Sequence, residues 1–312
     1  MWKKKKDTME LRFYEVPQNE YVLALLGDSW IRDYGHDESN LHFHNLMEIG
    51  YCRHGTGELI LNEESKPYEP AMVSIIPQNY PHVTISDSDS GPSFWEYLFF
   101  DPMVMIQELY PDNPVIQKKI LQMVNQKALF FHEWENPGVS VLVKMIMDEM
   151  RQKKKRFHEC VRGLMITLFA ELLRMCENDV AEDEIRKKTG VSQITPALEY
   201  VRNEYANNIR VEELAKASHM SETHFRRVFE SYMNMSPMDY INLMRVQKAC
   251  DIMKKTNDSM DVVAQKVGFT TTSTFNRNFK KYLNTSPYQW KISPENYERK
   301  LLNYNISALK GW

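Results

Sequence analysis

Residues 225–237 read FRRVFESYMNMSP, and residues 275–287 read FNRNFKKYLNTSP. The two stretches share seven identities at one fixed offset of fifty residues, with no gap between equivalent positions. An aromatic residue follows each copy, Tyr240 after the first and Trp290 after the second. Composition alone does not produce such a match, so the sequence predicts a duplicated helical unit.

Each copy has the pattern of a short helix, a tight turn and a second helix. In the first copy, residues 211–218 predict the short helix, and Ser221 is a good N-cap for the next one. In the second copy, residues 260–267 predict the short helix, Gly268 the turn, and Thr271 the N-cap. Helical spacing of apolar residues predicts which side chains are buried. In the two longer helices these are Phe225, Val228, Phe229, Phe275 and Phe279.

The outward face of the same two helices carries side chains suited to DNA. Arg, Asn, Thr and Ser are the residue types that hydrogen-bond base edges and phosphates. The predicted DNA-contacting residues are Thr223, Arg226, Arg227, Ser273, Asn276, Arg277, Lys280 and Lys281. The alternative is an ordinary helical bundle with surface charges, but a bundle does not account for the fifty-residue repeat. We therefore expect two helices that enter the major groove.

A single longer helix is predicted between the two units. Residues 237–254 would span about 27 Å at 1.5 Å per residue. Ser236 and Ser286 are expected N-caps, each followed by Pro at the first helical position, and Asn234 and Asn284 are expected left-handed C-caps. A rigid strut of this length would hold two recognition helices about one DNA turn, roughly 34 Å, apart.

Residues 194–291 resemble the DNA-binding domain of the AraC/XylS family of transcription regulators. The resemblance lies in Leu214-Ala215, the helix 221–229, Tyr240, Arg245, Ala249, Ala264, Val267-Gly268-Phe269 and residues 275–281. It implies base-reading positions at Thr223, Arg226 and Arg227 and at Ser273, Asn276 and Arg277. The chain departs from the family at Asn234 and Asn284, where Gly is usual, and at Glu230, where Lys is usual. The last departure predicts a weaker phosphate grip by the first helix.

Charge is distributed unevenly along the 312 residues, which are enough for two domains. Residues 192–291 hold 14 Lys and Arg against 10 Asp and Glu, whereas the rest of the chain holds 25 against 32. A positive excess confined to one segment fits a DNA-facing module beside an acidic regulatory one.

Cysteine usage and hydropathy both suit a cytoplasmic protein. The four cysteines form no CxxC pair, which argues against a disulfide scaffold or a zinc ribbon. The stretch MWKKKK at residues 1–6 is followed by DTME instead of the apolar run of a signal peptide. Residues 161–173 are too short and too polar to span a bilayer, so we expect no membrane segment.

The N-terminal half shows a different pattern. Residues 10–132 contain short alternating runs broken by Gly and Pro, typical of an all-β barrel or sandwich, and residues 138–178 return to helical spacing. The predicted fold class is therefore α+β with two domains. The expected organisation is a β-barrel at 1–135, a helical pair at 136–181, a linker at 182–193, a double helix-turn-helix at 194–292 and a tail at 293–312. The helical pair would either dimerise or pack on the same barrel.

The segment His42-x-His44-x3-Glu48-x6-Gly55 matches the first motif of the cupin fold, and residues 77–82 resemble the second, with Asn79 where Gly is usual. His at i and i+2 of a strand point to one face, so these side chains can converge on one centre. Such a set can hold a metal, but a metal-free pocket and a vestigial barrel remain alternatives. The family resemblance implies a small-molecule sensor, often for sugars. The candidate lining residues are Trp30, Trp95, Arg53, His42, His44, Glu48 and His82.

Taken together, these features favour a DNA-binding regulator that responds to a small molecule, and we expect a sugar or related carbohydrate. We expect it to be a homodimer that contacts DNA and RNA polymerase and uses no cofactor. The alternatives are a metal-dependent cupin enzyme that carries a DNA-binding domain, and a DNA-binding protein without an effector. The chain shows no Ser-His-Asp arrangement, P-loop or dinucleotide fingerprint, so we expect no catalytic residues and no enzymatic activity.

Overall fold

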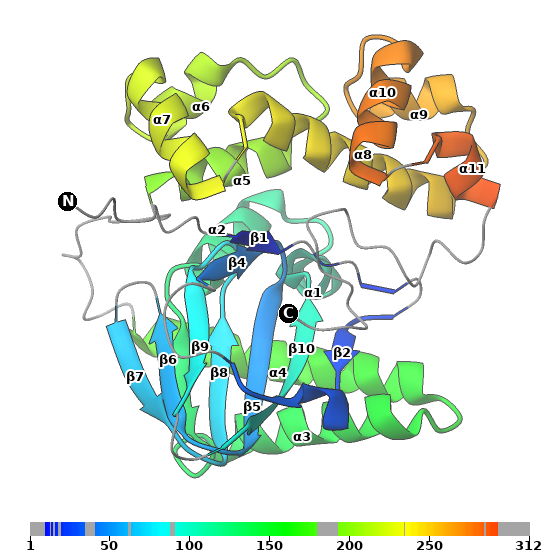
Figure 1. Cartoon of the computed structure of the whole chain (residues 1–312). Helices are drawn as coiled ribbons and strands as arrows, with labels where there is room; N and C mark the ends of the chain where they lie inside the picture. The colour runs from blue at the N-terminus through cyan, green and yellow to red at the C-terminus, as the bar shows by residue number, and fades with distance from the viewer. Residues whose placement is uncertain are drawn as a thin grey trace. The chain divides into compact units, whose positions relative to one another are not determined.

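The structure is a computed structural model. It describes residues 10–12, 14, 16–17, 20–34, 41–61, 64–87, 91–179, 193–233, 235–283 and 285–292. The predicted C-caps Asn234 and Asn284, the tail at 293–312 and all but residue 193 of the predicted linker lie outside these ranges. The chain divides into two compact units, mainly residues 12–187 and residues 188–310, which we describe separately (Figure 1). None of the described helices is long and apolar enough to cross a membrane.

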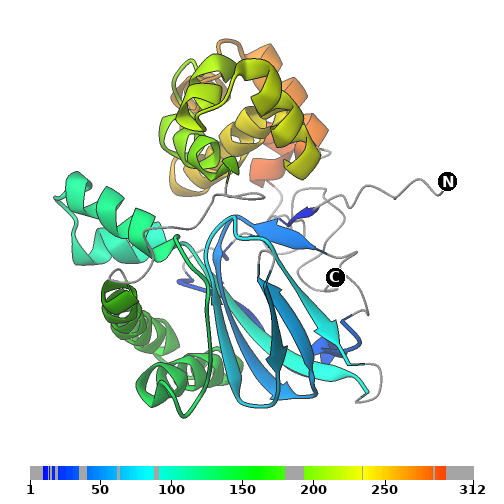
Figure 2. The same cartoon turned by 90° about the vertical axis from the view of Figure 1, so that its left-hand side faces the viewer.

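The N-terminal unit is built on two antiparallel sheets. The strands are β1 (Glu10–Arg12), β2 (Leu23–Leu25), β3 (Ile31–Arg32), β4 (His42–His44), β5 (Met47–His54), β6 (Gly57–Leu61), β7 (Glu64–Tyr68), β8 (Met72–Ile76), β9 (His82–Ser86), β10 (Ser93–Phe100) and β11 (Leu129–His132). One sheet has the order β1-β4-β9-β6-β7 and the other β11-β8-β5-β10-β2, with β3 paired to β10. Figure 2 shows the strands of this unit curving around a common interior. The prediction of a sheet-rich N-terminal region is confirmed.

The register of the second sheet separates its two faces. Glu48 lies opposite Phe99, and Gly50 lies opposite Tyr97, so these four residues belong to the inner face of the sheet. Their neighbours along the strands point the other way. The outer face belongs to a buried apolar cluster that joins sheet residues such as Ile49 to the helices that follow.

Four helices complete this unit, and two of them were not predicted. These are α1 (Pro102–Leu109), α2 (Pro114–Val124), α3 (Pro137–Gln152) and α4 (Phe157–Asp179), and a 3-10 turn, η1, spans Asp28–Trp30. We expected only strands and turns before residue 132, so α1 and α2 correct that expectation. Asp101 and Asn113 each cap a helix that has Pro at its first position. This combination of a capping residue and Pro is a local signal for the start of a helix.

Helices α3 and α4 match the predicted helical pair. Their buried side chains, including Val143, Ile146, Met165 and Phe169, belong to the same apolar cluster as the outer face of the sheet. The pair therefore packs on its own sheet.

The C-terminal unit consists of seven described helices. They are α5 (Thr195–Glu204), α6 (Val211–Ala217), α7 (Glu222–Met233), α8 (Pro237–Lys255), α9 (Met260–Lys266), α10 (Thr272–Leu283) and α11 (Pro287–Ile292). Helices α6 and α7 form the first helix-turn-helix motif, and α9 and α10 form the second. Figure 1 shows α8 running between the two motifs.

The sequence repeat is also a repeat of packing. Phe225 and Phe229 in α7 are fully buried, as are Phe275 and Phe279 in α10. Phe229 meets Tyr240 edge-on at 5.8 Å between ring centroids. Phe279 meets Trp290 in the same way at 6.0 Å. Each motif thus packs against the first turns of the helix that follows it. Burial of each aromatic side chain contributes on the order of 2 kcal/mol to the free energy of folding.

Candidate functional site

Helix α7 begins where the sequence predicts. The Ser221 hydroxyl accepts a hydrogen bond from the His224 amide at 3.4 Å, which caps the helix. Because Phe225 and Phe229 are buried, the opposite face of the helix turns outward, and Thr223, Arg226 and Arg227 are all exposed.

The exposed charges of α7 are partly neutralised within the helix. Arg226 donates through Nη2 to Glu222 at 2.7 Å, and Arg227 lies 3.2 Å from Nδ1 of His224. Exposed Glu230 adds a second acidic side chain to this face. Glu222 and Glu230 therefore offset Arg226 and Arg227, and the surface charge of α7 is nearly balanced.

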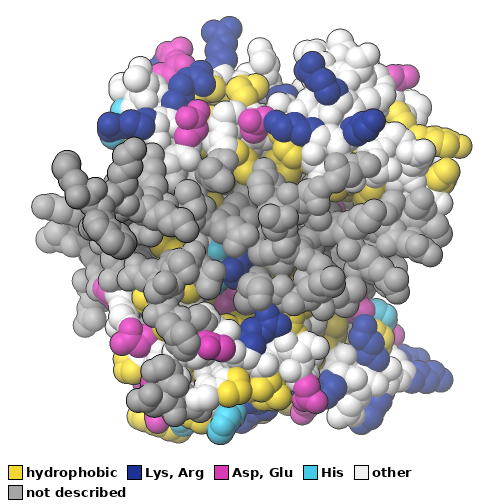
Figure 3. Space-filling view, in the orientation of Figure 1, with side chains coloured by type: hydrophobic (Ala, Val, Ile, Leu, Met, Phe, Trp, Pro, Cys, Tyr) yellow, Lys and Arg dark blue, Asp and Glu magenta, His cyan; other side chains and the backbone are white. Residues whose placement is uncertain are grey.

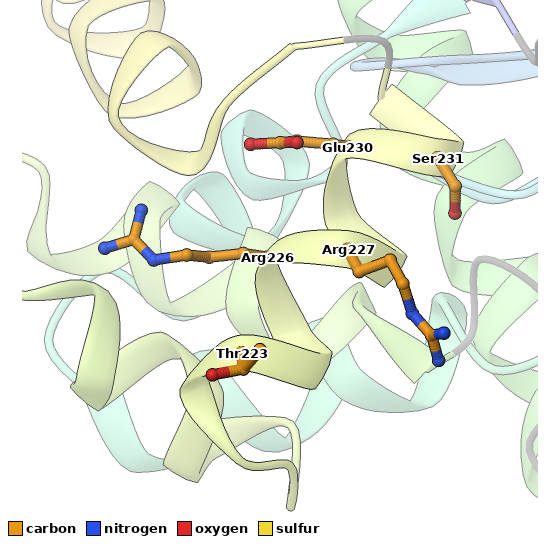
Figure 4. Close-up of a pocket in the computed structure, with 5 residues that line it drawn as sticks. All are labelled: Thr223, Arg226, Arg227, Glu230 and Ser231. Atoms are coloured by element: carbon orange, nitrogen blue, oxygen red, sulfur yellow. The ribbon is translucent and has the colours of Figure 1, made fainter.

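A hollow of about 450 Å³ lies on this face of α7, lined by Thr223, Arg226, Arg227, Glu230 and Ser231. Figure 4 shows the two arginines extending from the helix in opposite directions, Arg226 on the side of Thr223 and Glu230, and Arg227 on the side of Ser231. Two guanidinium groups that flank a hollow can contact separate phosphates or bases along a groove.

Helix α10 presents a more positive face. Thr271 caps it by accepting from the Thr274 amide at 3.2 Å, and the Thr272 hydroxyl bonds Asp261 of α9. Its exposed face carries the five predicted residues Ser273, Asn276, Arg277, Lys280 and Lys281, with no acidic residue among them. Lys281 is exposed, but its ammonium forms an ion pair with Asp239 of α8. Lys and Arg side chains are spread over the visible face of this unit (Figure 3).

The structure brings the four cupin-type residues of the N-terminal unit together. His42 on β4 is paired in register with His82 on β9, and their ring centroids lie 4.3 Å apart. His44 lies 4.9 Å from His82 by the same measure. Nε2 of His44 is 3.1 Å from Oε2 of Glu48, and Nε2 of His82 is 3.6 Å from the same oxygen. All four side chains are buried.

Backbone carbonyls fix how the histidines face Glu48. Nδ1 of His44 lies 2.7 Å from Leu46 O, and Nδ1 of His82 lies 2.9 Å from Tyr80 O. A carbonyl only accepts, so both Nδ1 atoms carry a hydrogen and both Nε2 atoms turn to the carboxylate. Burial alone would raise the pKa of Glu48, but the electrostatic interaction with His82 and the hydrogen bond between Glu48 and His44 lower it to about 2. Burial lowers the pKa of His44.

This arrangement needs a positive charge between the imidazoles and the carboxylate. A proton on one Nε2 supplies it, and so would a divalent cation, because donor atoms of His44, Glu48 and His82 lie within 4.8 Å of one another. Two imidazole nitrogens and a carboxylate oxygen fit a first-row transition metal, and the carbonyl partners at Nδ1 are those of typical metal-bound histidines.

The remaining predicted lining residues do not form one group. Trp95 is buried on the inner face and lies parallel to Tyr97, with centroids 6.2 Å apart. Trp30 meets Tyr97 edge-on at 6.0 Å. Arg53 lies outside this group, because its guanidinium bonds Glu96 at 2.8 Å and approaches Met147 of α3 on the outer face of the sheet. The expectation that Arg53 lines the interior is therefore corrected.

The N-terminal unit also contains a hollow that was not predicted. It measures about 950 Å³ and is lined by residues of β6, β7, the start of β8 and the end of β9, with the preceding Thr56 and the following Asp87. Its wall includes Tyr68, whose hydroxyl lies 2.8 Å from Ser93 Oγ and whose ring meets Trp95 edge-on at 5.1 Å. No local motif marks these residues, because they converge only through strand pairing.

Comparison with known proteins agrees with the geometry of the C-terminal unit. A family model described as a helix-turn-helix domain matches residues 214–292. MtrA of Neisseria gonorrhoeae, an HTH-type transcriptional regulator, is 26% identical over 290 residues, covering 86% of this chain and 92% of its own. An uncharacterized HTH-type transcriptional regulator of Haemophilus influenzae is 24% identical over 261 residues, covering 80% and 86%.

A third relative is named for a sugar operon. The raffinose operon transcriptional regulatory protein RafR of Pediococcus pentosaceus is 21% identical over 248 residues, covering 78% of this chain and 84% of its own. These alignments extend well beyond the helix-turn-helix match into the sheet-rich unit. The chain is therefore similar over most of its length to HTH-type transcriptional regulators, in agreement with the AraC/XylS resemblance of residues 194–291.

Proposed function

We propose that α7 and α10 read DNA sequence in two successive major grooves. The observation that carries this proposal is the division of both helices into a fully buried Phe stripe and an exposed face of Arg, Asn, Ser and Thr. The first face carries Arg226 and Arg227, and the second carries Asn276 and Arg277. These groups reach base edges and phosphates only when their helix is anchored by its other side.

The length of α8 supports reading on one side of the duplex. Its 19 residues span about 28 Å, which is close to the roughly 34 Å between successive major grooves on the same face. Since the two motifs flank this helix, one chain would contact two short sequence elements about one turn apart.

We further propose that the N-terminal unit binds a small-molecule effector, a sugar or related carbohydrate. The unpredicted hollow has the volume of a ligand site, and its wall includes Tyr68, whose ring packs edge-on against the buried Trp95. Tyr68, Ser86 and Asp87 supply hydroxyl and carboxylate partners there. The histidine cluster is a second candidate within the same interior. The name of the RafR relative favours the carbohydrate class.

A homodimer formed through α3 is the proposed assembly. Val141 and Met145 lie one turn apart on α3 and are 50% and 48% exposed. A second copy would cover these apolar side chains, and an effector that favours one dimer arrangement would change how two C-terminal units engage DNA. Contact with RNA polymerase is part of the proposed role.

Selection of bound sequences from random DNA, with the full chain and with or without a sugar library, tests the proposal. We expect a motif with two elements about one helical turn apart, and a change of enrichment when the effector is present. Recovery of random sequences would refute sequence-specific recognition. A thermal shift with a sugar, absent in variants of Trp95 or His44, would support the effector site. Bound transition metal together with substrate turnover would instead favour a metal-dependent enzyme.

A further inference from the structure

One buried arginine connects three segments of the C-terminal unit. Arg245, in the middle of α8, is only 8% exposed. Its Nε donates to Tyr205 O at 2.8 Å, and its Nη2 donates to Asn207 O at 2.8 Å. Both carbonyls belong to the turn between α5 and α6, which leads into the first motif. The two donors of one planar guanidinium thus fix the position of this turn against α8.

The same arginine also touches the second motif. Its Cζ lies 5.6 Å from the ring centroid of Phe269, which is buried in the turn between α9 and α10. Gly268, the residue before it, has φ of 89°. A Cβ at that position would lie 2.6 Å from Ala206 O and 2.9 Å from Tyr205 O. The turn of the second motif therefore contacts the backbone of the 205–207 turn directly.

We propose that this junction, formed by Arg245, the 205–207 turn and Gly268-Phe269, sets the spacing between the two DNA elements that the chain accepts. The proposal rests on the function proposed above. A single connecting helix leaves α7 and α10 free to change angle when α8 bends or twists. A second attachment on the side of α8 removes that freedom, because the motifs are then joined at two places. Arg245 acts here as a positioning residue.

The geometry of DNA explains why a rigid junction would restrict the spacing between the two elements. One inserted base pair moves the second element by about 3.4 Å and rotates it by about 34–36° around the duplex. A rigid pair of recognition helices cannot follow that displacement, whereas a loosely joined pair can. The junction should therefore determine tolerance to spacing, and it should have little effect on how each helix contacts its own element.

The first experiment measures the junction in the absence of DNA. Spin labels at Glu230→Cys in α7 and Lys280→Cys in α10, in full-length protein with Cys160→Ser and Cys176→Ser, report the distance between the two helices. We expect one narrow distance distribution, which broadens in Arg245→Met and in Phe269→Leu. Lys248→Met, a loss of charge elsewhere on α8, should leave it narrow. An unchanged distribution in both junction variants would overturn the proposal.

The second experiment measures affinity for duplexes whose two selected elements are separated by the preferred spacer or by one base pair more or less. We expect the wild type to lose roughly tenfold or more when the spacer changes, and Arg245→Met to lose only about threefold. Binding to a single element should match between the two proteins. Equal weakening on every duplex would show a merely structural role and refute the proposal. Phe269→Leu provides the same comparison if Arg245→Met unfolds.

The two experiments together distinguish an error in the proposed function from an error in the role of the junction. If the wild type binds no DNA specifically while the distance distribution still broadens in the variants, the proposed function is wrong and the rigid junction stands. If DNA binding is specific and its spacing profile is unaffected by both variants, the function stands and the junction does not set spacing.

Discussion

At the scale of single residues, the exposed arginines of α7 and α10 carry the proposed sequence recognition. We expect Arg277→Ala to lower specific affinity by roughly 1–3 kcal/mol and to relax preference at one base position. The reason is that a side chain on the exposed face of a well-anchored helix contributes through its own contact. Fluorescence anisotropy with the selected duplex and its single-base variants measures both effects.

Arg174→Ala is the matched control for this prediction. Arg174 is an exposed arginine on α4 whose guanidinium forms an ion pair with Glu171, three residues earlier on the same helix, at 2.5 Å. Its removal takes away the same charge from the N-terminal unit and should leave affinity and base preference unchanged. If Arg277→Ala and Arg174→Ala behave alike, α10 is not a recognition helix.

Loss of the Glu48 carboxylate should destabilise the N-terminal unit. Its carboxylate is buried between Nε2 of His44 and Nε2 of His82. Glu48→Gln removes the negative partner from a buried pair, so we expect the free energy of unfolding to fall by about 3 kcal/mol. Chemical denaturation monitored by tryptophan fluorescence measures it. Glu58→Gln, at an exposed carboxylate on β6, should leave the midpoint nearly unchanged, and equal midpoints for all three proteins would contradict the prediction.

At the scale of elements, the helix boundaries of the C-terminal unit followed from local chemistry. Caps at Ser221 and Thr271 place the starts of α7 and α10, and Pro237 and Pro287 follow the caps of the next helices. Helices α1 and α2 carry the same kind of signal, a capping residue before Pro, but they lie within a region dominated by strand patterns. The strand pattern of the surrounding residues therefore outweighed these two helix-start signals in the prediction.

The charge balance of α7 leads to a prediction at this scale. Glu222 holds Arg226 in an ion pair and places a negative charge on the proposed DNA-facing surface. We expect Glu222→Gln to raise DNA affinity a few-fold at low salt, since it frees a guanidinium and removes repulsion from phosphate. Anisotropy titrations measure the change, with Glu171→Gln on α4 as the matched control. A decrease in affinity would mean that the ion pair orders Arg226 for binding.

At the scale of the whole molecule, the two motifs should contribute unequally to electrostatic binding. The exposed face of α10 combines Arg277 and Lys280 with no acidic residue, whereas Glu222 and Glu230 offset the arginines of α7. Affinity should fall steeply with salt, and Lys280→Gln should reduce the log–log slope by about 0.9, the value for one phosphate contact. Titrations between low and physiological salt test this. A slope equal to that of the wild type would exclude Lys280 from the phosphate contacts.

The sequence by itself determined the duplicated motif, the buried and exposed faces of α7 and α10, and the shared strand face of His42 and His44. Each of these depends on short-range periodicity, either 3.6 residues in a helix or two in a strand, which is readable along the chain. The fifty-residue repeat added evidence that no single motif provides.

Arg53 lies five residues after Glu48 on β5, so the same period of two already places the two side chains on opposite faces. Only the tertiary structure decided where the hollow beside Tyr68 lies and how Arg245 joins three segments. These features depend on strand register and on contacts between residues far apart in sequence, such as Arg245 and Asn207. A shift of one residue in register would exchange the two faces of a strand, and local patterns do not specify long-range pairing. Packing against partners that are distant in the chain therefore determines where such side chains point.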